Sequence, residues 1–338
     1  MNILSLFDGM SCGQIALNRA GIKYDKYFAS EVDKYAIKVT QKNYPDTIQI
    51  GDIRNIKAKD LPKIDLIIGG SPCQGFSLAG KQLNFDDPRS ALFFEYVRLL
   101  NELRKINPEI KFLLENVNMK NEYLRIISEY LGIFSVRINS NLVSAQNRAR
   151  WYWSNIRTKK IGLFEELYTD IPQPEDKGIL LKDILQPESE IDEKYYLRNV
   201  EIIKAIDNHK SKVWRTGNKM GNMDFPNNKN KKSKCLTTIH IPGDRSVNHI
   251  GVLNNNGVFK ETVKSNCLDA NYFKGIDNHQ QRTGILYKNR FRRLTPVECE
   301  RLQTVPDNYT DCVSDTQRYK MLGNGWTVDI IAHIFKYL

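Results

Sequence analysis

The chain has 338 residues, of which 41% are hydrophobic and 26% are charged, and its formal net charge is +11. No apolar run approaches the ~20 residues that cross a bilayer, and the N-terminus lacks the basic and apolar regions of an export signal. The six cysteines form no CxxC pair and the five histidines show no metal-ligand spacing. We therefore expect reduced thiols, no bound metal, no membrane association and a cytoplasmic location in a bacterial or phage-infected cell.

The first 156 residues alternate short apolar strands with amphipathic helices. Strands are expected at 2–7, 26–30, 47–53, 65–70 and 111–116, with helices at 12–21, 32–44, 90–106 and 121–132 and a strand-rich end at 134–143 and 151–156. The strands are continuously apolar, which is typical of strands buried on both faces. The pattern predicts an α/β fold with a doubly wound, mostly parallel sheet.

Glycine, proline and polar residues stand where five successive expected strands end. They are Asp8 and Gly9, Glu31, Asp52, Pro72 and Cys73, and Glu115 and Asn116. The carboxyl ends of parallel strands share one edge of the sheet, and ligands bind beyond that edge. The sequence therefore predicts one site built from these positions.

After residue 156 the alternation stops and the charge changes. Residues 198–293 carry 19 Lys and Arg against 7 Asp and Glu, so the whole excess of positive charge lies there. A polyanion such as nucleic acid is the natural partner, although a lysine-rich surface would give the same balance. Helical periodicity returns at 294–305, where Thr295 caps and Pro296 opens the helix, and again at 326–338. We expect a catalytic and cofactor-binding domain over 1–190, completed by 294–338, and a smaller irregular domain over 191–293.

The stretch FDGMSCG follows the first strand and suits a glycine-rich cofactor turn. It is neither GxGxxG nor GxxxxGK[ST], which disfavours a dinucleotide or a nucleoside triphosphate. Glu31 ends the second strand, where a carboxylate can accept hydrogen bonds from ribose hydroxyls. An ordinary strand-to-helix turn would give the first of these features, and a solvated loop acid would give the second. Together with Asp52, however, the two features favour a bound adenosine.

The stretch GGSPCQGFS places Cys73 just past a buried strand. A cysteine there is either an inert core residue or a nucleophile. Pro72 before it and polar, glycine-containing residues after it favour a thiol presented to a cleft. Glu115 could supply a proton donor nearby, and Arg148 and Arg150 alternate on one face and suit a phosphate or a carbonyl-bearing base. An exposed basic edge strand is the alternative for the two arginines.

Five further motifs accompany these: GDI, LLENV, QNRAR, RRLTPVECERLQTVPDNY and LGNGWTV. In these motifs and in their order along the chain, the sequence resembles the cytosine-5 DNA methyltransferases that use S-adenosylmethionine. The resemblance implies a Rossmann-like methyltransferase fold and a DNA-recognition domain in the basic segment. Two departures are visible: the first turn has fewer glycines than in many members, and the tail reads Gly-Asn-Gly where many bacterial members have Gly-Asn-Ser.

The resemblance also implies roles for individual residues. Cys73 would add as a thiolate to carbon 6 of a flipped-out cytosine, Glu115 would bond the ring at nitrogen 3 and the amine, Arg150 would bind the base carbonyl, and Arg148 would lie near the phosphate or the thiolate. S-adenosylmethionine, with S-adenosylhomocysteine as product, would contact Phe7, Asp8, Gly9, Ser11, Cys12, Gly13, Glu31, Val32, Asp52, Ile53, Pro72, Leu92, Asn324, Gly325 and Trp326.

Double-stranded DNA is the expected partner. Its contacts are expected from Gln74, Ser77, Arg89, Lys232, Lys234, Thr237, Lys264, Asn266, Arg282 and Arg290, with further phosphate contacts from 229–234 and 290–293. We expect a monomer that serves a restriction–modification system with a cognate endonuclease or acts as a phage or orphan enzyme.

Three alternatives remain. A transfer-RNA methyltransferase of the same fold would usually carry a Cys-Phe-Thr stretch, which is absent, and a two-cysteine RNA methyltransferase would need a cysteine near Glu115. A catalytically silent DNA-binding module is disfavoured by the presence of Cys73, Glu115, Arg148 and Arg150 together.

Overall fold

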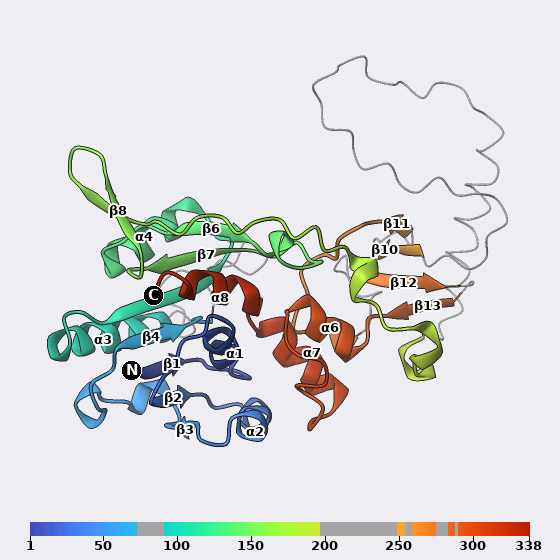
Figure 1. Ribbon diagram of the computed structural model, residues 1–338, viewed down its shortest axis with the longest axis horizontal. Helices are drawn as coiled ribbons and strands as arrows, with labels where there is room; N and C mark the ends of the chain where they lie inside the picture. Colours follow the sequence, from blue (N-terminus) through green and yellow to red (C-terminus); the bar gives the residue numbers. More distant parts are fainter. Residues whose placement is uncertain (73–90, 197–248, 254–258, 275–282, 288–289) are drawn as a thin grey trace, which may run out of the picture. The chain divides into compact units, whose positions relative to one another are not determined.

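The computed structural model describes residues 1–72, 91–196, 249–253, 259–274, 283–287 and 290–338 (Figure 1). The chain divides into two compact units. Unit 1 comprises Met1–Leu185, Cys267–Phe273 and Pro296–Leu338, and unit 2 comprises Gln186–Asn266 and Lys274–Thr295. Residues 267–273, which the sequence places in the middle of the second domain, thus belong with unit 1. No helix in the described ranges is long and apolar enough to cross a membrane.

Unit 1 is built on a seven-stranded sheet with the strand order β3-β2-β1-β4-β5-β7-β6 (Figure 1). The strands are β1 (Asn2–Leu6), β2 (Lys26–Ser30), β3 (Ile48–Gln49), β4 (Leu66–Gly69), β5 (Lys111–Val117), β6 (Val136–Asn139) and β7 (Ala149–Ser154). The first five are parallel, while β7 is antiparallel to both β5 and β6. This is the expected mostly parallel sheet of the Rossmann-like methyltransferase type.

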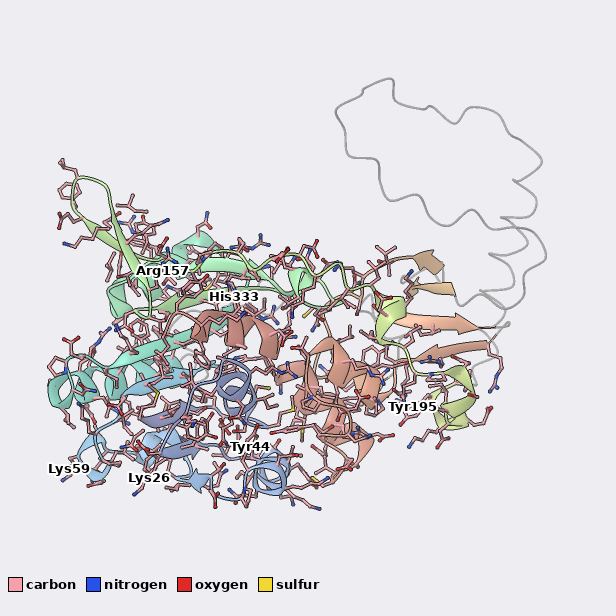
Figure 2. The ribbon with its side chains drawn as sticks, viewed as in Figure 1. Lys26, Tyr44, Lys59, Arg157, Tyr195 and His333 are labelled. Atoms are coloured by element: carbon pink, nitrogen blue, oxygen red, sulfur yellow. The ribbon has the colours of Figure 1, made fainter. Side chains whose placement is uncertain are left out.

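In the described residues, α1 to α4 alternate with the strands of the sheet, and α6 to α8 follow one another at the end of the chain. The helices are α1 (Cys12–Arg19), α2 (Lys34–Asn43), α3 (Ala91–Ile106), α4 (Asn121–Leu131), α6 (Pro296–Leu302), α7 (Asp315–Asn324) and α8 (Val328–Phe335). The expected helix at 294–305 is confirmed as α6, which Pro296 opens. The expected tail helix is α8, which joins α1 through an Arg19–Asp329 ion pair of 2.6 Å. His333 lies on the same helix (Figure 2), and its ring donates to the carbonyl of Pro172 at 2.8 Å.

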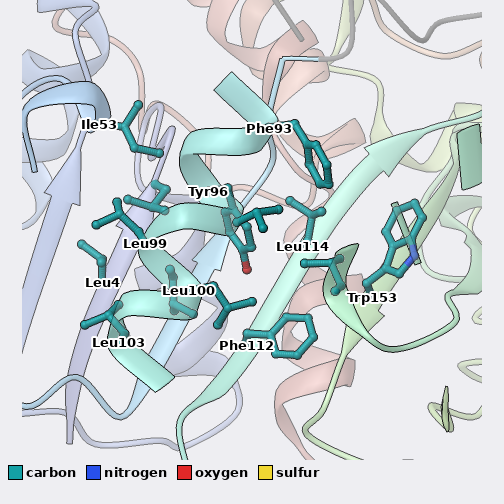
Figure 3. Packing of buried hydrophobic residues seen from close by; sticks show 14 of the residues in the cluster. Leu4, Ile53, Phe93, Tyr96, Leu99, Leu100, Leu103, Phe112, Leu114 and Trp153 are labelled. Carbon is teal, nitrogen blue, oxygen red and sulfur yellow. The ribbon is translucent and has the colours of Figure 1, made fainter. Parts of the chain in front are cut away.

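One face of the sheet carries the main hydrophobic core. Apolar residues recur three and four positions apart along α3 and pack onto the strands, so that Tyr96 and Leu100 lie against Phe112 and Leu114 (Figure 3). Trp153 of β7 is fully buried in the same cluster. The rigid sheet that results fixes the positions at which its strands end.

The opposite face of the sheet is approached closely by α1. A Cβ atom at Gly13 would lie 2.6 Å from both Ile68 Cδ1 and Tyr27 Oη, so only glycine allows this packing distance. Gly13 therefore serves the close packing of α1 on the sheet.

Several elements differ from the expectations. The third strand is only two residues long, because Gly51 has a left-handed backbone with φ of 75° and a 3-10 turn at Ile53–Asn55 follows. The hairpin of β8 (Thr158–Ile161) and β9 (Glu166–Thr169) and the helix α7 were not expected. The strands of the hairpin are short and mostly exposed and α7 is rich in polar residues, so neither produces a clear hydrophobic period.

Unit 2 contains an antiparallel sheet with the order β11-β10-β12-β13. Its strands are β10 (His249–Leu253), β11 (Phe259–Glu261), β12 (Thr283–Tyr287) and β13 (Arg290–Arg293). β10 has the sequence HIGVL, a short apolar run inside the segment that was expected to be irregular. Arg292 was expected among the phosphate contacts, and this is wrong: its side chain is 0% exposed and pairs with Glu188 at 3.1 Å.

Candidate active site

A cavity of about 830 Å³ lies in unit 1 where the parallel strands end. Of the residues expected to hold the cofactor, those lining it are Phe7, Asp8, Gly9, Cys12, Glu31, Val32, Asp52, Ile53, Pro72, Leu92, Asn324, Gly325 and Trp326. Glu115, Arg148 and Arg150 line it as well. Ser11 and Gly13 do not: Ser11 is fully buried and accepts a hydrogen bond from Gln14, and Gly13 packs under Tyr27.

The first turn owes its shape to left-handed backbone. Phe7, Gly9 and Ser11 have φ values of 57°, 60° and 63°. Such angles are costly for residues other than glycine, and they persist only where surrounding contacts hold them. The turn is held from the next strand, because the Gly9 amide donates to Glu31 Oε2 at 2.8 Å.

Glu31 is fixed by three backbone amides. Besides Gly9, the amides of Val32 and Asp33 donate to its Oε1 at 2.7 and 2.8 Å. Each carboxylate oxygen has about two acceptor sites, so this set orients the group and leaves one site on Oε2 for a further donor. The neighbouring Val32 is 69% exposed, so it offers an apolar surface beside a carboxylate.

Asp52 forms an ion pair with Arg54. Arg54 Nε lies 3.0 Å from both carboxylate oxygens, and this pairing lowers the pKa of Asp52. Ile53 beside it is buried and anchors the 3-10 turn.

Asp8 differs from the other carboxylates of the cavity because it is buried. Tyr27 donates to its Oδ1 at 2.7 Å, while Oδ2 is enclosed and accepts no hydrogen bond from a described residue. Burial raises the pKa of Asp8 to about 6, against the opposing effect of neighbouring hydroxyl groups. Cys12 is also buried, which raises the pKa of its thiol to about 12 and makes it a packing residue.

Glu115 and Arg150 form a compact pair on adjacent strands. Arg150 Nε lies 3.0 Å from Glu115 Oε1, and the two side chains are only 14% and 12% exposed. The indole Nε1 of Trp326 donates to Glu115 Oε2 at 3.2 Å. The sequence predicted Glu115 and Arg150 at one site, but it placed Trp326 only at the cofactor.

Arg148 is buried and uses its guanidinium within the protein. It donates to the carbonyls of Leu268, Gly323 and Gly325 at 2.9, 3.1 and 2.9 Å. Its expected place near a phosphate or the thiolate stays a prediction. The structure adds a positioning role, because Arg148 ties two distant segments of unit 1 to β7.

Cys267, which the sequence did not single out, does not line the cavity but contacts two arginines that do. Its Sγ accepts from Arg148 at 3.2 Å and lies 3.7 Å from Arg150. Desolvation by the surrounding protein atoms works against ionisation, but the two guanidinium groups outweigh it and lower the pKa of Cys267. No local pattern marks this thiol, since its partners lie far away in sequence.

Several expected residues lie outside the described part of the chain. These are Cys73, Gln74, Ser77, Arg89, Lys232, Lys234, Thr237 and Arg282. Among the expected DNA contacts, Lys264, Asn266 and Arg290 are described and belong to unit 2. Arg290 pairs with Glu193 at 2.8 Å, and its guanidinium lies 3.7 Å from the ring centroid of Tyr196. Within the described ranges, no cluster of three or more His, Cys, Asp or Glu residues could hold a metal ion.

Comparison with known proteins is consistent across sequence and structure. The orphan methyltransferase M.SPRI of Bacillus phage SPR is 28% identical over 432 aligned residues, covering 100% of this chain and 97% of the relative. The type II methyltransferase M.HpaII of Haemophilus parainfluenzae is 32% identical, with 97% and 86% covered. The structure of the Entamoeba histolytica methyltransferase EhMeth has a similar fold, with a TM-score of 0.67 at 16% identity and 100% and 97% coverage. The family model for C-5 cytosine-specific DNA methylases matches residues 1–338, and the chain belongs to that family.

Proposed function

We propose that the chain transfers a methyl group from S-adenosylmethionine to carbon 5 of a cytosine in a specific duplex DNA sequence and releases S-adenosylhomocysteine. One observation carries the proposal. A single cavity is lined both by residues suited to adenosine, Glu31 and Val32, and by the Glu115–Arg150 pair, and Pro72 at its wall directly precedes Cys73.

The cavity fits the cofactor in size and chemistry. A volume of about 830 Å³ lies within the range of pockets that hold ligands of this size. Glu31 would bind the ribose hydroxyls, Val32 would pack on the adenine, and Asp52 and Ile53 would meet its edge. Asp8 Oδ2, buried without a described partner, could meet a donor that enters the cavity. The bound cofactor supplies an electrophilic methyl group on a sulfonium.

The remaining residues act on the base. Carbon 5 of cytosine is a poor nucleophile until a thiolate adds to carbon 6, and we assign that addition to Cys73. Glu115 would bond nitrogen 3 and the exocyclic amine, and Arg150 would hold both Glu115 and the base carbonyl. After carbon 5 takes the methyl group, a base removes its proton and the bond from carbon 6 to sulfur breaks.

The target must leave the helix before it can reach this cavity. Extruding a base costs a few kcal/mol. Residues 74–89 and the basic segment, with Lys232, Lys234, Lys264 and Arg290 among them, would offset that cost through phosphate and base contacts. We propose that the chain works as a monomer, either beside a cognate restriction endonuclease or as a phage or orphan enzyme.

Labelled S-adenosylmethionine tests the proposal directly. Label should pass to duplex DNA with the unaltered chain and should not pass with Cys73→Ala. Duplex DNA containing 5-fluorocytosine at the target should trap a covalent adduct on Cys73. Label on transfer RNA with none on duplex DNA would replace the proposal by the transfer-RNA alternative.

A further inference from the structure

The carboxylate of Glu115 has a different partner at each oxygen: an ion pair with Arg150 at Oε1 and a hydrogen bond from Trp326 at Oε2. Arg150 Nε lies 3.0 Å from Oε1, and Trp326 Nε1 donates to Oε2 at 3.2 Å. Each oxygen has two acceptor sites, so the bond from Trp326 leaves one on Oε2, and Oε1 beside Arg150 also keeps room for a donor from a base. The orientation of the carboxylate is thus set from two different parts of the chain.

Gly70 makes the contact between Glu115 and Trp326 possible. A Cβ atom at this position would lie 2.9 Å from Glu115 Oε2 and 3.0 Å from Trp326 Nε1. Any side chain at residue 70 would therefore push against both atoms of the hydrogen bond. Glycine at position 70 therefore leaves the space in which the Glu115–Trp326 hydrogen bond forms.

The backbone that carries Trp326 is held firmly. Arg148 donates to the carbonyl of Gly325 at 2.9 Å, and the thiol of Cys12 donates to the carbonyl of Trp326 at 3.9 Å. Asn324, Gly325 and Trp326 themselves line the cavity. The indole therefore connects the wall of the proposed cofactor site to the carboxylate of the proposed base site.

We propose that Trp326 is a positioning residue, whose indole N–H holds the Glu115 carboxylate in the orientation that meets the target base. This inference rests on the proposed role of Glu115. Loss of the N–H should disturb the base and spare the cofactor. Misplacement of a catalytic group by about 1 Å can cost ~100-fold in rate, so we expect the methyl-transfer step to slow by about 10- to 100-fold.

A spectroscopic test needs no activity. The chain has four tryptophans, so the indole N–H signal of Trp326 can be assigned in a ¹⁵N spectrum as the one lost in Trp326→Phe. Glu115→Ala should shift that signal, because it removes the hydrogen-bond acceptor. An unchanged signal would overturn the inference, whatever the enzyme methylates.

A kinetic test separates positioning from packing. Single-turnover methylation at saturating S-adenosylmethionine should slow in Trp326→Phe, while the Kd for the cofactor should change by less than about threefold, since a ring remains. Trp151→Phe is the matched control: Trp151 packs against the hydrophobic core, does not line the cavity and should not affect the rate.

Gly70→Ala offers a second route to the same contact. It should also slow single-turnover methylation, and the double variant should be no slower than the slower single variant, because both changes break one hydrogen bond. In a Glu115→Ala background, Trp326→Phe should have no further effect. A rate loss explained by cofactor Kd alone, or full additivity with Gly70→Ala, would overturn the inference. The substrate is whichever nucleic acid the unaltered chain methylates, so failure of the DNA assignment is seen separately.

Discussion

Replacing Arg148 by lysine should destabilise the protein and weaken cofactor binding together. The guanidinium donates to the carbonyls of Leu268, Gly323 and Gly325, and its residue is 4% exposed. A lysine keeps the charge, but its compact ammonium cannot span carbonyls on two separate segments. At least two of these hydrogen bonds would be lost.

The magnitude follows from the chemistry of those bonds. A hydrogen bond from a charged donor contributes about 1.5–3 kcal/mol, and a buried acceptor left alone incurs a penalty of similar size. Arg148→Lys should therefore lower the free energy of unfolding by about 3–5 kcal/mol. Gly323 and Gly325 also line the cavity, so the Kd for S-adenosylmethionine should rise as their segment loosens.

Urea denaturation measures the first effect and calorimetric titration with S-adenosylmethionine the second. Arg125→Lys is the matched control, since Arg125 is 78% exposed and, within the described residues, pairs with Glu129 on its own helix alone. It should change stability by less than about 0.5 kcal/mol. If Arg148→Lys unfolds at the same urea concentration as the unaltered chain, with the same m-value, the positioning role given to Arg148 is refuted.

Three further changes test the cavity and its supports. Glu31→Ala should raise the Kd for S-adenosylmethionine by about 10- to 100-fold in calorimetry, because charged hydrogen bonds to the ribose are lost, and an unchanged Kd would remove Glu31 from the site. Asp8 has a pKa of about 6 in the folded chain against an ordinary value of 3.8, so folding favours its protonated form. The stability that the protonated carboxyl contributes is fully present below about pH 4 and is lost as the pH rises past 6. The stability of Asp8→Asn relative to the unaltered chain should thus rise by up to ~3 kcal/mol between pH 4 and 7, and a flat difference in urea titrations would contradict the buried carboxyl. Gly323→Ala would place a Cβ atom 2.2 Å from the backbone of Asp269, so we expect a loss of about 2–3 kcal/mol in thermal unfolding rather than the gain that alanine usually gives in a helix.

The sequence predicts the sheet and its functional edge well, because both depend on repeated local patterns. Apolar strands must be buried, and the polar residues that end them must then meet at one edge. Glu31, Asp52 and Glu115 line one cavity for this reason. The third strand was predicted too long, and the β8–β9 hairpin was not predicted. The residues of both are largely exposed and show little hydrophobic period.

The partners of polar side chains could not be predicted in the same way. Nothing near Arg148 in sequence indicates that it bonds the carbonyls of Leu268 and Gly325, and nothing near Trp326 indicates Glu115. These contacts join segments that only the folded chain brings together. The buried state of Asp8 is similar: its position after a strand marks it as polar and near a ligand, while its enclosure depends on Tyr27 and the helix above.

Bisulfite sequencing of DNA from cells that express the chain tests the proposed reaction most directly. We predict cytosines protected by 5-methylation at one sequence context, and none with Cys73→Ala. The account would be contradicted if the folded protein is abundant in the cells and their transfer RNA gains 5-methylcytosine, while their DNA shows no protected cytosines.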